Sequence, residues 1–173
     1  LPVVPFEDVE TFYTPDKFLF FTPMSLKKMN LLRKNIYFEI KEKGFELINY
    51  ISWQATIFDN VIGDNCFILE NNTVQPFTKI GNNVILWSGN HIGHHGIIED
   101  HVFFSSHVVM SGRCTINSYC FLGVNSSIKD GITLAEGTLV GMSASVMKPT
   151  KSWGVYVGNP SKRLKNKKST DLI

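Results

Sequence analysis

The sequence is poor in charge and has no long apolar run. Charged residues make up 18% of the 173 positions, whereas hydrophobic residues make up 43%. This balance excludes a disordered chain and a coiled coil. No apolar run approaches the roughly 18–20 residues that a membrane helix needs. We therefore expect a globular chain that does not insert into a membrane and that is long enough to bury a sizeable core.

Cysteines are also scarce, and the chain has no obvious export signal. The three cysteines, Cys66, Cys114 and Cys120, show no paired spacing, which favours free thiols in a reducing compartment. The start, Leu1-Pro2-Val3-Val4, lacks both an initiator Met and the charged and apolar segments of a secretion signal. It is typical of a chain that begins partway through a longer gene product. The predicted location is the cytoplasm.

The net charge of +2 is unevenly distributed. Residues 148–173 hold seven basic side chains against one acidic one, Asp171, whereas residues 1–147 hold ten basic and fourteen acidic side chains. The basic tail has no interleaved aromatic residues, and the rest of the chain is acidic. Nucleic acid is therefore not an expected partner.

A repeat of six residues runs through the middle of the chain. Every sixth residue from Ile62 to Val146 is apolar, without an insertion, and Gly recurs at the next position. Neither a helix nor an ordinary strand has this period. The fifth position of the repeat is mostly small or β-branched and includes all three cysteines. The pattern predicts a parallel β-solenoid of about five coils, with three repeats in each 18-residue coil and the cysteines packed inside.

The residues before the repeat predict a small βαβ-like fragment. We expect a buried strand at Lys17–Thr22, a helix from its cap at Ser25 to about Lys43, and a second strand at Phe45–Tyr50. The predicted organisation is a partial α/β domain at 1–50, the solenoid at 51–147, and a C-terminal cap with the basic tail at 148–173.

Three stretches carry a family resemblance: Asn-His-Ile-Gly-His-His-Gly-Ile-Ile at 90–98, Cys-Phe-Leu-Gly-Val-Asn-Ser at 120–126, and Gly-Val-Tyr-Val-Gly-Asn-Pro-Ser-Lys-Arg-Leu at 154–164. With the repeat, they resemble the left-handed β-helix acyltransferases, and most of all the bacillosamine and perosamine N-acetyltransferases and the sialic-acid O-acetyltransferases. The resemblance covers about residues 17–165. It implies a left-handed β-helix, a homotrimer and acetyl-CoA as the acyl donor.

The chain departs from this family in two places. Family members usually begin with a Gly-rich strand–turn–helix that cradles the nucleotide of an activated sugar, and this sequence lacks that element. The catalytic histidine of the family is usually followed by Asp or Glu, whereas here His94 is followed by His95.

All five histidines lie between positions 91 and 107: His91, His94, His95, His101 and His107. Three of them, His95, His101 and His107, are six residues apart and so belong to three different faces of one coil. They are not expected to form a zinc site within one chain.

Residues 18 apart are expected to stack, which places His94 next to Gly112. Acyl transfer needs a base for the attacking group and a donor for the developing oxyanion, and a histidine beside a glycine amide could supply both. The resemblance implies that His94 is the general base and that the amide of Gly112 contacts the thioester. Because no acidic residue follows His94, we expect Glu99, Asp100 or a group from an adjacent subunit to orient it.

Coenzyme A is expected in a groove between two solenoids. The resemblance implies that it runs past Phe103, Gly112, Val124, Gly141 and Met142. The segment 157–163, with Gly158, would close over the adenine, and Lys162, Arg163 and Lys148 are candidate partners for the phosphates.

The expected reaction is transfer of the acetyl group of acetyl-CoA to the amino group of a nucleotide-activated amino-deoxy sugar, for a surface glycan. The amine would attack directly, with His94 as general base and no metal ion. Three alternatives stay open: a sugar O-acetyltransferase, a zinc hydratase of the γ-carbonic-anhydrase type with ligands across subunit interfaces, and an inactive assembly subunit.

Overall fold

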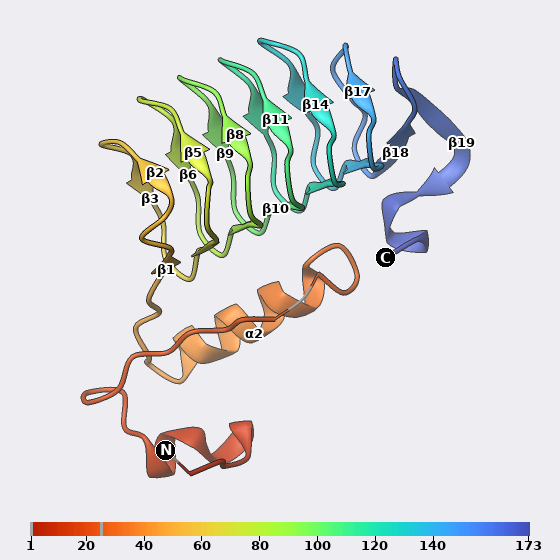
Figure 1. The fold of residues 1–173 in the computed structure, drawn as a ribbon. Coiled ribbons are helices and arrows are strands. Elements are labelled where there is room, and N and C mark those ends of the chain that lie inside the picture. Colours follow the sequence, from red (N-terminus) through yellow and green to blue (C-terminus); the bar gives the residue numbers. More distant parts are fainter. Residues whose placement is uncertain (1, 25) are drawn as a thin grey trace.

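The computed structural model describes residues 2–24 and 26–173 and consists mainly of a parallel β-solenoid (Figure 1). Short strands succeed one another at each turn of the coil. Their bounds are β1 Tyr50–Ile51, β2 Thr56–Ile57, β3 Val61–Ile62, β4 Phe67–Ile68, β5 Thr73–Val74, β6 Lys79–Ile80, β7 Ile85–Leu86, β8 His91–Ile92, β9 Ile97–Ile98, β10 Phe103–Phe104, β11 Val109–Met110, β12 Thr115–Ile116, β13 Phe121–Leu122, β14 Ser127–Ile128, β15 Thr133–Leu134, β16 Leu139–Val140, β17 Ser145–Val146, β18 Gly154–Val157 and β19 Lys162–Lys168.

The strands form three sheets, which are the three faces of a prism. The first sheet has the order β1-β4-β7-β10-β13-β16-β18-β19, the second β17-β14-β11-β8-β5-β2, and the third β15-β12-β9-β6-β3. All pairs are parallel except β18 with β19. The predicted parallel solenoid is confirmed, but it has about six coils instead of five. The difference arises because β1 and β2 before the repeat, and β18 after it, also join the sheets.

The repeat positions supply the core of the prism. From Ile68 to Val146, each sixth residue is at most 2% exposed, and the residues form one continuous apolar cluster. Burying this apolar surface is the main stabilising contribution to such a fold. The three cysteines are free and buried in the same cluster, as the repeat predicts.

One coil near the start is a residue shorter than the others. Tyr50 pairs with Phe67, 17 residues later, whereas Val61 pairs with Lys79, 18 residues later. Asn60 closes the shortened turn, because its side-chain amide donates to the carbonyl oxygens of Gln75 at 2.9 Å and Thr78 at 3.0 Å. These two bonds join the shortened turn to the next coil and satisfy two of its carbonyl oxygens.

The N-terminal part contains less strand than the sequence predicts. It comprises η1 (Phe6–Asp8), α1 (Val9–Phe12) and α2 (Leu31–Glu42). The expected strands at 17–22 and 45–50 are wrong as extended strands: they meet only at one parallel bridge between Phe20 and Leu47. The apolar side chains of these segments pack against α2 instead, as in the cluster of Phe20, Phe45 and Leu47 with Tyr37 and Ile40.

The helix also begins later than expected. Lys28, Met29 and Asn30 have φ angles of 52°, 53° and 65°, so the chain turns here and helix α2 begins only at Leu31. The predicted end is close to the observed one, with Gly44 at φ 85° after the last turn. The predicted cap, Ser25, lies outside the described residues.

Helix α2 lies alongside the solenoid (Figure 1) and is fixed to one of its corners. This corner, between the third and first sheets, carries Asn65, Asn83, His101 and Tyr119, one in each coil. The buried Arg33 of α2 donates to the carbonyl oxygens of Asn65, at 2.9 Å, and of Asn83. These bonds satisfy a charged group that would otherwise be costly to bury. Burial still lowers the pKa of Arg33 to about 10.

The C-terminal residues extend the first sheet and form its last strand. Strand β18 continues the parallel sheet beyond β16, and β19 turns back antiparallel to β18. Strand β19 holds most of the basic tail, and all its residues are exposed. The short helix η2 (Ser169–Asp171) follows. Within residues 2–24 and 26–173, no helix is long and apolar enough to cross a membrane.

Candidate active site

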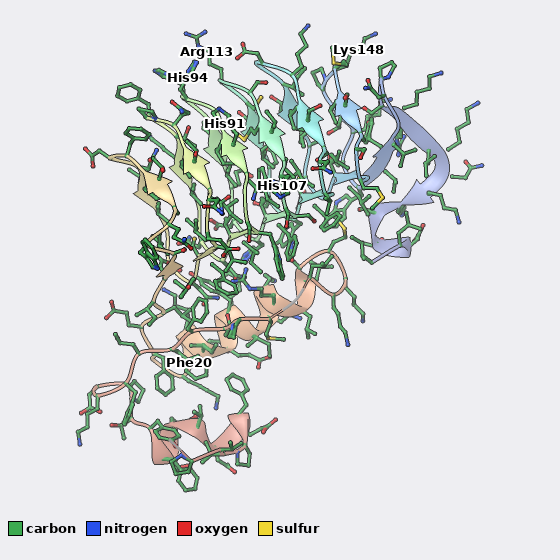
Figure 2. The ribbon with its side chains drawn as sticks, in the orientation of Figure 1. Phe20, His91, His94, His107, Arg113 and Lys148 are labelled. Carbon is green, nitrogen blue, oxygen red and sulfur yellow. The ribbon has the colours of Figure 1, made fainter. Side chains whose placement is uncertain are left out.

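The candidate site lies at the corner between the second and third sheets. Here His94, Gly112, Asp130 and Lys148 follow one another at intervals of one coil, in the turns after β8, β11, β14 and β17. We call this row the His94 column. Figure 2 shows His94 at this edge of the solenoid and Lys148 further along it. The backbone amide of Arg113 donates to the carbonyl oxygen of His94 at 2.9 Å, which fixes the two coils to each other.

Two side chains flank Gly112 within the His94 column. A Cβ atom on Gly112 would lie 2.8 Å from Cε1 and 2.9 Å from Nε2 of His94, and 3.0 Å from Oδ1 of Asp130. No acceptor for the Gly112 amide is present among the residues that the structure describes. An imidazole nitrogen, a carboxylate and a backbone donor therefore meet at one point of the corner, and the two side chains fill the space that a side chain on residue 112 would need.

The neighbour of His94 in sequence is also its neighbour in space. The Nδ1 atoms of His94 and His95 are 3.0 Å apart, and their rings are perpendicular with centroids 5.1 Å apart. The ring of Phe77, one coil earlier, lies 4.8 Å from that of His95. Sequence reasoning treated His95 only as a departure from the family pattern and missed this contact.

The expectation that Glu99 or Asp100 orients His94 is wrong. The Oε2 atom of Glu99 accepts hydrogen bonds from the backbone amide and the hydroxyl of Ser118. The Oδ1 atom of Asp100 accepts one from the amide of Asn82 at 2.7 Å. Both carboxylates lie in the turns after β9, at the next corner, because they follow His94 by almost one third of a coil.

The other histidines do not join this site. His101 is buried beside α2, where its Nδ1 lies 2.8 Å from the side-chain amide of Asn83 and burial lowers its pKa to about 4. His107 lies at the third corner, over Gly89, and His91 is exposed on β8. As the spacing predicts, His95, His101 and His107 are at three different corners. In the described part of the chain, no three His, Cys, Asp or Glu side chains are grouped to hold a metal ion.

The residues expected to bind coenzyme A divide between two corners. Gly112 belongs to the His94 column, whereas Val124, Gly141 and Met142 lie in the turns between the first and second sheets. The second sheet separates the two sets. A single chain therefore does not bring His94 together with Val124, Gly141 or Met142. The hexad spacing could have shown this separation, because Gly112 differs from Val124 by two thirds of a coil.

Some of the residues expected to bind coenzyme A line two hollows. The first, about 320 Å³, is mainly apolar and is lined by Leu26, Trp87, Phe103, Ser105, Ser106 and Val124. Phe103 itself is largely buried, with its ring 5.6 Å from that of Phe121. The second hollow, about 380 Å³, lies at the C-terminal end of the prism, and its lining includes Lys148, Tyr156, Ser161 and Lys162. Lys148 connects this hollow to the His94 column.

Gly158 lies near the second hollow, in the connection between β18 and β19. Its φ of 91° requires a left-handed backbone, and its carbonyl oxygen accepts a hydrogen bond from Ser145 at 3.1 Å. The connection is thereby held over the end of β17. Sequence reasoning missed Asp130 and Trp87 as well as His95. Counting one coil of 18 residues onward from Gly112 would have identified Asp130.

Comparisons with known sequences agree with the repeat. Residues 61–94 match the family described as the bacterial transferase hexapeptide, six repeats. An acyl-[acyl-carrier-protein]–UDP-N-acetylglucosamine O-acyltransferase of Sinorhizobium fredii is 25% identical over 107 residues, covering 58% of this chain and 40% of that protein. A tetrahydropyridine-dicarboxylate N-succinyltransferase of a Chelativorans species is 31% identical over 90 residues, covering 52% and 28%. The chain thus spans two fifths or less of the length of these relatives.

Solved structures share the fold over nearly the whole chain. A histidine-to-asparagine variant of perosamine N-acetyltransferase from Caulobacter crescentus, in complex with CoA and GDP-perosamine, has a TM-score of 0.89 at 19% identity, covering 96% of this chain and 79% of that one. The acetyltransferase domain of PglB from Neisseria gonorrhoeae, in complex with acetyl coenzyme A, has a TM-score of 0.87 at 21% identity, covering 94% and 78%. The predicted left-handed β-helix and the resemblance to hexapeptide-repeat acyltransferases are confirmed.

Proposed function

We propose that this chain transfers an acetyl group from acetyl-CoA to the amino group of a nucleotide-activated amino sugar, with His94 as the general base. The observation that carries the proposal is the meeting of three groups at one corner: Nε2 of His94 and Oδ1 of Asp130 both lie against the backbone of Gly112. The fold supports it, because proteins with the same fold are described in complex with CoA and GDP-perosamine or with acetyl coenzyme A.

The geometry suits a direct attack. The amine nitrogen forms a bond to the thioester carbonyl carbon, the bond from that carbon to sulfur breaks, and the amine proton moves to Nε2 of His94. His94 then returns the proton to the leaving sulfur, so that an amide and a free thiol result. General base catalysis of this kind contributes typically about 10²–10⁴-fold to the rate.

An acyl-enzyme on cysteine is not needed and would be poorly supported by the fold. Cys66, Cys114 and Cys120 are buried in the core of the prism. Burial raises the pKa of Cys66 and Cys120 to about 12 and also raises that of Cys114. A thiol that stays protonated is a weak nucleophile.

The amide of Gly112 is the proposed donor to the oxyanion. Negative charge develops on the carbonyl oxygen as the amine attacks, and a fixed backbone donor stabilises it without reorganisation. The Gly112 amide has no acceptor within the described part of the chain and lies on the solenoid corner beside His94.

Asp130 favours an amine over a hydroxyl as the acceptor. Its carboxylate lies against Gly112 from the coil that follows, whereas His94 lies in the coil that precedes it. A carboxylate attracts an amino sugar in its ammonium form, whereas a neutral hydroxyl gains no such attraction. The ammonium then loses one proton to solvent, and the neutral amine attacks and passes its next proton to His94. This favours N-acetylation over the O-acetylation that the sequence left open.

The described residues fit coenzyme A, which would be bound as the acyl donor. The apolar hollow at Trp87, Phe103 and Val124 suits the pantetheine chain, and Lys148 and Lys162 at the second hollow suit phosphate groups. Gly141 and Met142 lie at the same corner as Val124, and Gly158 lies in the chain between residues that line the second hollow.

Because Val124, Gly141 and Met142 lie at a different corner from His94 in one chain, we propose that neighbouring copies in a homotrimer complete the site. The corner with His94 of one copy would then face the corner with Val124 and Met142 of the next. Light scattering measures the mass of the assembly. A monomer that turns over at full rate would contradict this arrangement.

The function is tested by a thiol-release assay with acetyl-CoA and a panel of nucleotide-linked amino sugars, each compared with its hydroxyl counterpart. We expect release with an amino sugar, and a loss of about 100-fold or more in kcat for His94→Ala. Circular dichroism and light scattering establish that the variant keeps its fold and assembly. Turnover of His94→Ala at nearly the rate of the unaltered protein would overturn the role of His94.

A further inference from the structure

We infer that His95 is the positioning residue for His94, in the place where the family usually has a carboxylate. It accepts a hydrogen bond from Nδ1–H of His94 and so keeps Nε2 of His94 free of a proton on the side of Gly112. The inference rests on the proposed function, since it explains how His94 is prepared to act as a base. It concerns a contact between two imidazoles that the sequence pattern alone does not reveal.

The contact between the two Nδ1 atoms determines which nitrogens of His94 and His95 can carry protons. The two Nδ1 atoms are 3.0 Å apart, which is hydrogen-bond distance, so one nitrogen must donate and the other accept. A neutral imidazole carries one N–H, on either Nδ1 or Nε2. If His95 donates, the proton of His94 lies on Nε2; if His94 donates, its Nε2 is bare.

Only the second arrangement can work in the proposed reaction. Nε2 is the nitrogen of His94 that lies toward Gly112, 2.9 Å from the position of a Cβ on that residue. A protonated Nε2 at that point could not accept a proton from the attacking amine. His95 must therefore act as the acceptor, with its own proton on Nε2.

The surroundings hold His95 in place for this contact. Its backbone has a φ of 56°, and its amide donates to the carbonyl oxygen of Pro76 at 3.2 Å. The ring of Phe77 lies against its ring at an interplanar angle of 38°. A supporting side chain that is already ordered fixes the reacting group without a further loss of entropy.

The hydrogen bond also gains strength during the reaction. When His94 takes up the amine proton, its Nδ1–H becomes a donor from a cation, and such bonds are about twice as strong as neutral ones. A bond that strengthens in the transition state raises kcat and leaves substrate binding unchanged. A change in kcat without a change in KM therefore distinguishes a positioning role of His95 from a general effect on the fold or on the binding of either substrate.

The kinetic test compares three variants by thiol release. For His95→Ala we expect kcat to fall about tenfold to 100-fold, as for other residues that orient a functional histidine, with little change in KM for either substrate. His95→Asp offers a carboxylate acceptor, and Asp tolerates this backbone conformation, so kcat should recover most of the loss. Arg113→Ala, at the same corner one coil later, is the matched control and should keep the kcat of the unaltered protein.

A spectroscopic test does not depend on activity. Nitrogen NMR of the resting protein, labelled at histidine, distinguishes the two neutral tautomers. We expect His94 to carry its proton on Nδ1 in the unaltered protein and to become a mixture of tautomers in His95→Ala. A proton on Nε2 of His94 in the unaltered protein would overturn the inference.

The two hypotheses fail in different ways. If His94→Ala is inactive while His95→Ala keeps its full kcat, only the role of His95 is wrong. If the unaltered protein releases no thiol with any acceptor, or if His94→Ala stays active, the proposed function is wrong. In that case the tautomer of His94 still decides whether His95 accepts the hydrogen bond.

Discussion

The imidazole of His94 occupies the space that a side chain on Gly112 would need. The two residues are one coil apart, and a Cβ on Gly112 would lie 2.8 Å from Cε1 of His94. Because Gly112 has no side chain, there is room beside it for the imidazole of His94, the catalytic candidate in the coil before. Four predictions follow from this and from the other stacked positions.

Gly112→Ala should remove activity while keeping the fold. The atoms that the new methyl group meets are the ends of the His94 and Asp130 side chains, and both can rotate away. The rotation would take Nε2 away from the Gly112 amide, and the methyl group would take its place. We expect a loss of about 100-fold or more in kcat, similar to the loss of an oxyanion donor. Thiol release measures it; activity within threefold of the unaltered protein would contradict the role assigned to the contact of His94 with Gly112.

Asp130→Asn should weaken the use of an amino sugar and leave a hydroxyl sugar unaffected. The substitution keeps the shape of the side chain and removes its charge. We expect KM for the amino sugar to rise about fivefold, the equivalent of the ~1 kcal/mol typical of a partly exposed ion pair. Asp130→Glu, which keeps the charge, is the control. Equal changes for the amino and hydroxyl acceptors would show that Asp130 does not select the amine.

His101 should make the protein less stable in acid. Burial lowers its pKa to about 4, below the 6.5 of an exposed histidine, and its Nδ1 faces the side-chain amide of Asn83. Asp100 opposes this shift, whereas Arg33 and Lys34 add to it. Between about pH 6.5 and pH 4 the unfolded chain therefore binds a proton that the folded chain does not, and the free energy of unfolding falls as the pH falls.

Urea denaturation at several pH values between 4 and 7.5 measures this dependence. His101→Asn is the matched variant, because Asn tolerates the φ of 61° at this position and does not titrate. We expect its stability to vary less with pH over the same interval. Parallel curves for the variant and the unaltered protein would show that another group causes the acid sensitivity.

Gly137→Ala should destabilise the protein much more than Gly131→Ala. Both glycines have left-handed backbones, with φ of 63° and 69°. A Cβ on Gly137 would lie 2.3 Å from the ring of Trp153, whereas nothing lies within 4 Å of one on Gly131. We expect Gly131→Ala to cost only the conformational strain, about 1 kcal/mol, and Gly137→Ala to cost at least ~2 kcal/mol more.

Urea denaturation of the two glycine variants gives both free energies of unfolding. Equal losses would show that Trp153 moves away from the corner without cost. A larger loss for Gly131→Ala would contradict the packing at both positions.

The solenoid could be predicted because its strict period leaves few other folds. Each inward residue from Ile68 to Val146 is where the sequence places it, and the stacking of His94 on Gly112 follows from the same count. The contact of His94 with His95 could not be predicted, because it depends on how two adjacent side chains turn at a corner.

The N-terminal part was less predictable because tertiary contacts determine it. Arg33 would ordinarily be placed on the exposed face of a helix. Here it is 1% exposed, because backbone carbonyl oxygens at the solenoid corner accept its hydrogen bonds. Helix α2 is therefore oriented by a charged residue as much as by its apolar ones, and no periodicity of hydrophobic residues indicates that.

The shortened coil before Ile62 has a consequence for any change in chain length. From β3 to β17 each coil holds 18 residues, so that one residue added or removed there would shift all later side chains one step around the prism. A deletion between His94 and Gly112 would bring Arg113 next to His94 and carry Asp130 and Lys148 away from that edge. The coil that is one residue shorter lies upstream of His94, Gly112, Asp130 and Lys148. The length of this stretch, as much as the identity of its residues, therefore keeps His94, Gly112, Asp130 and Lys148 in one column.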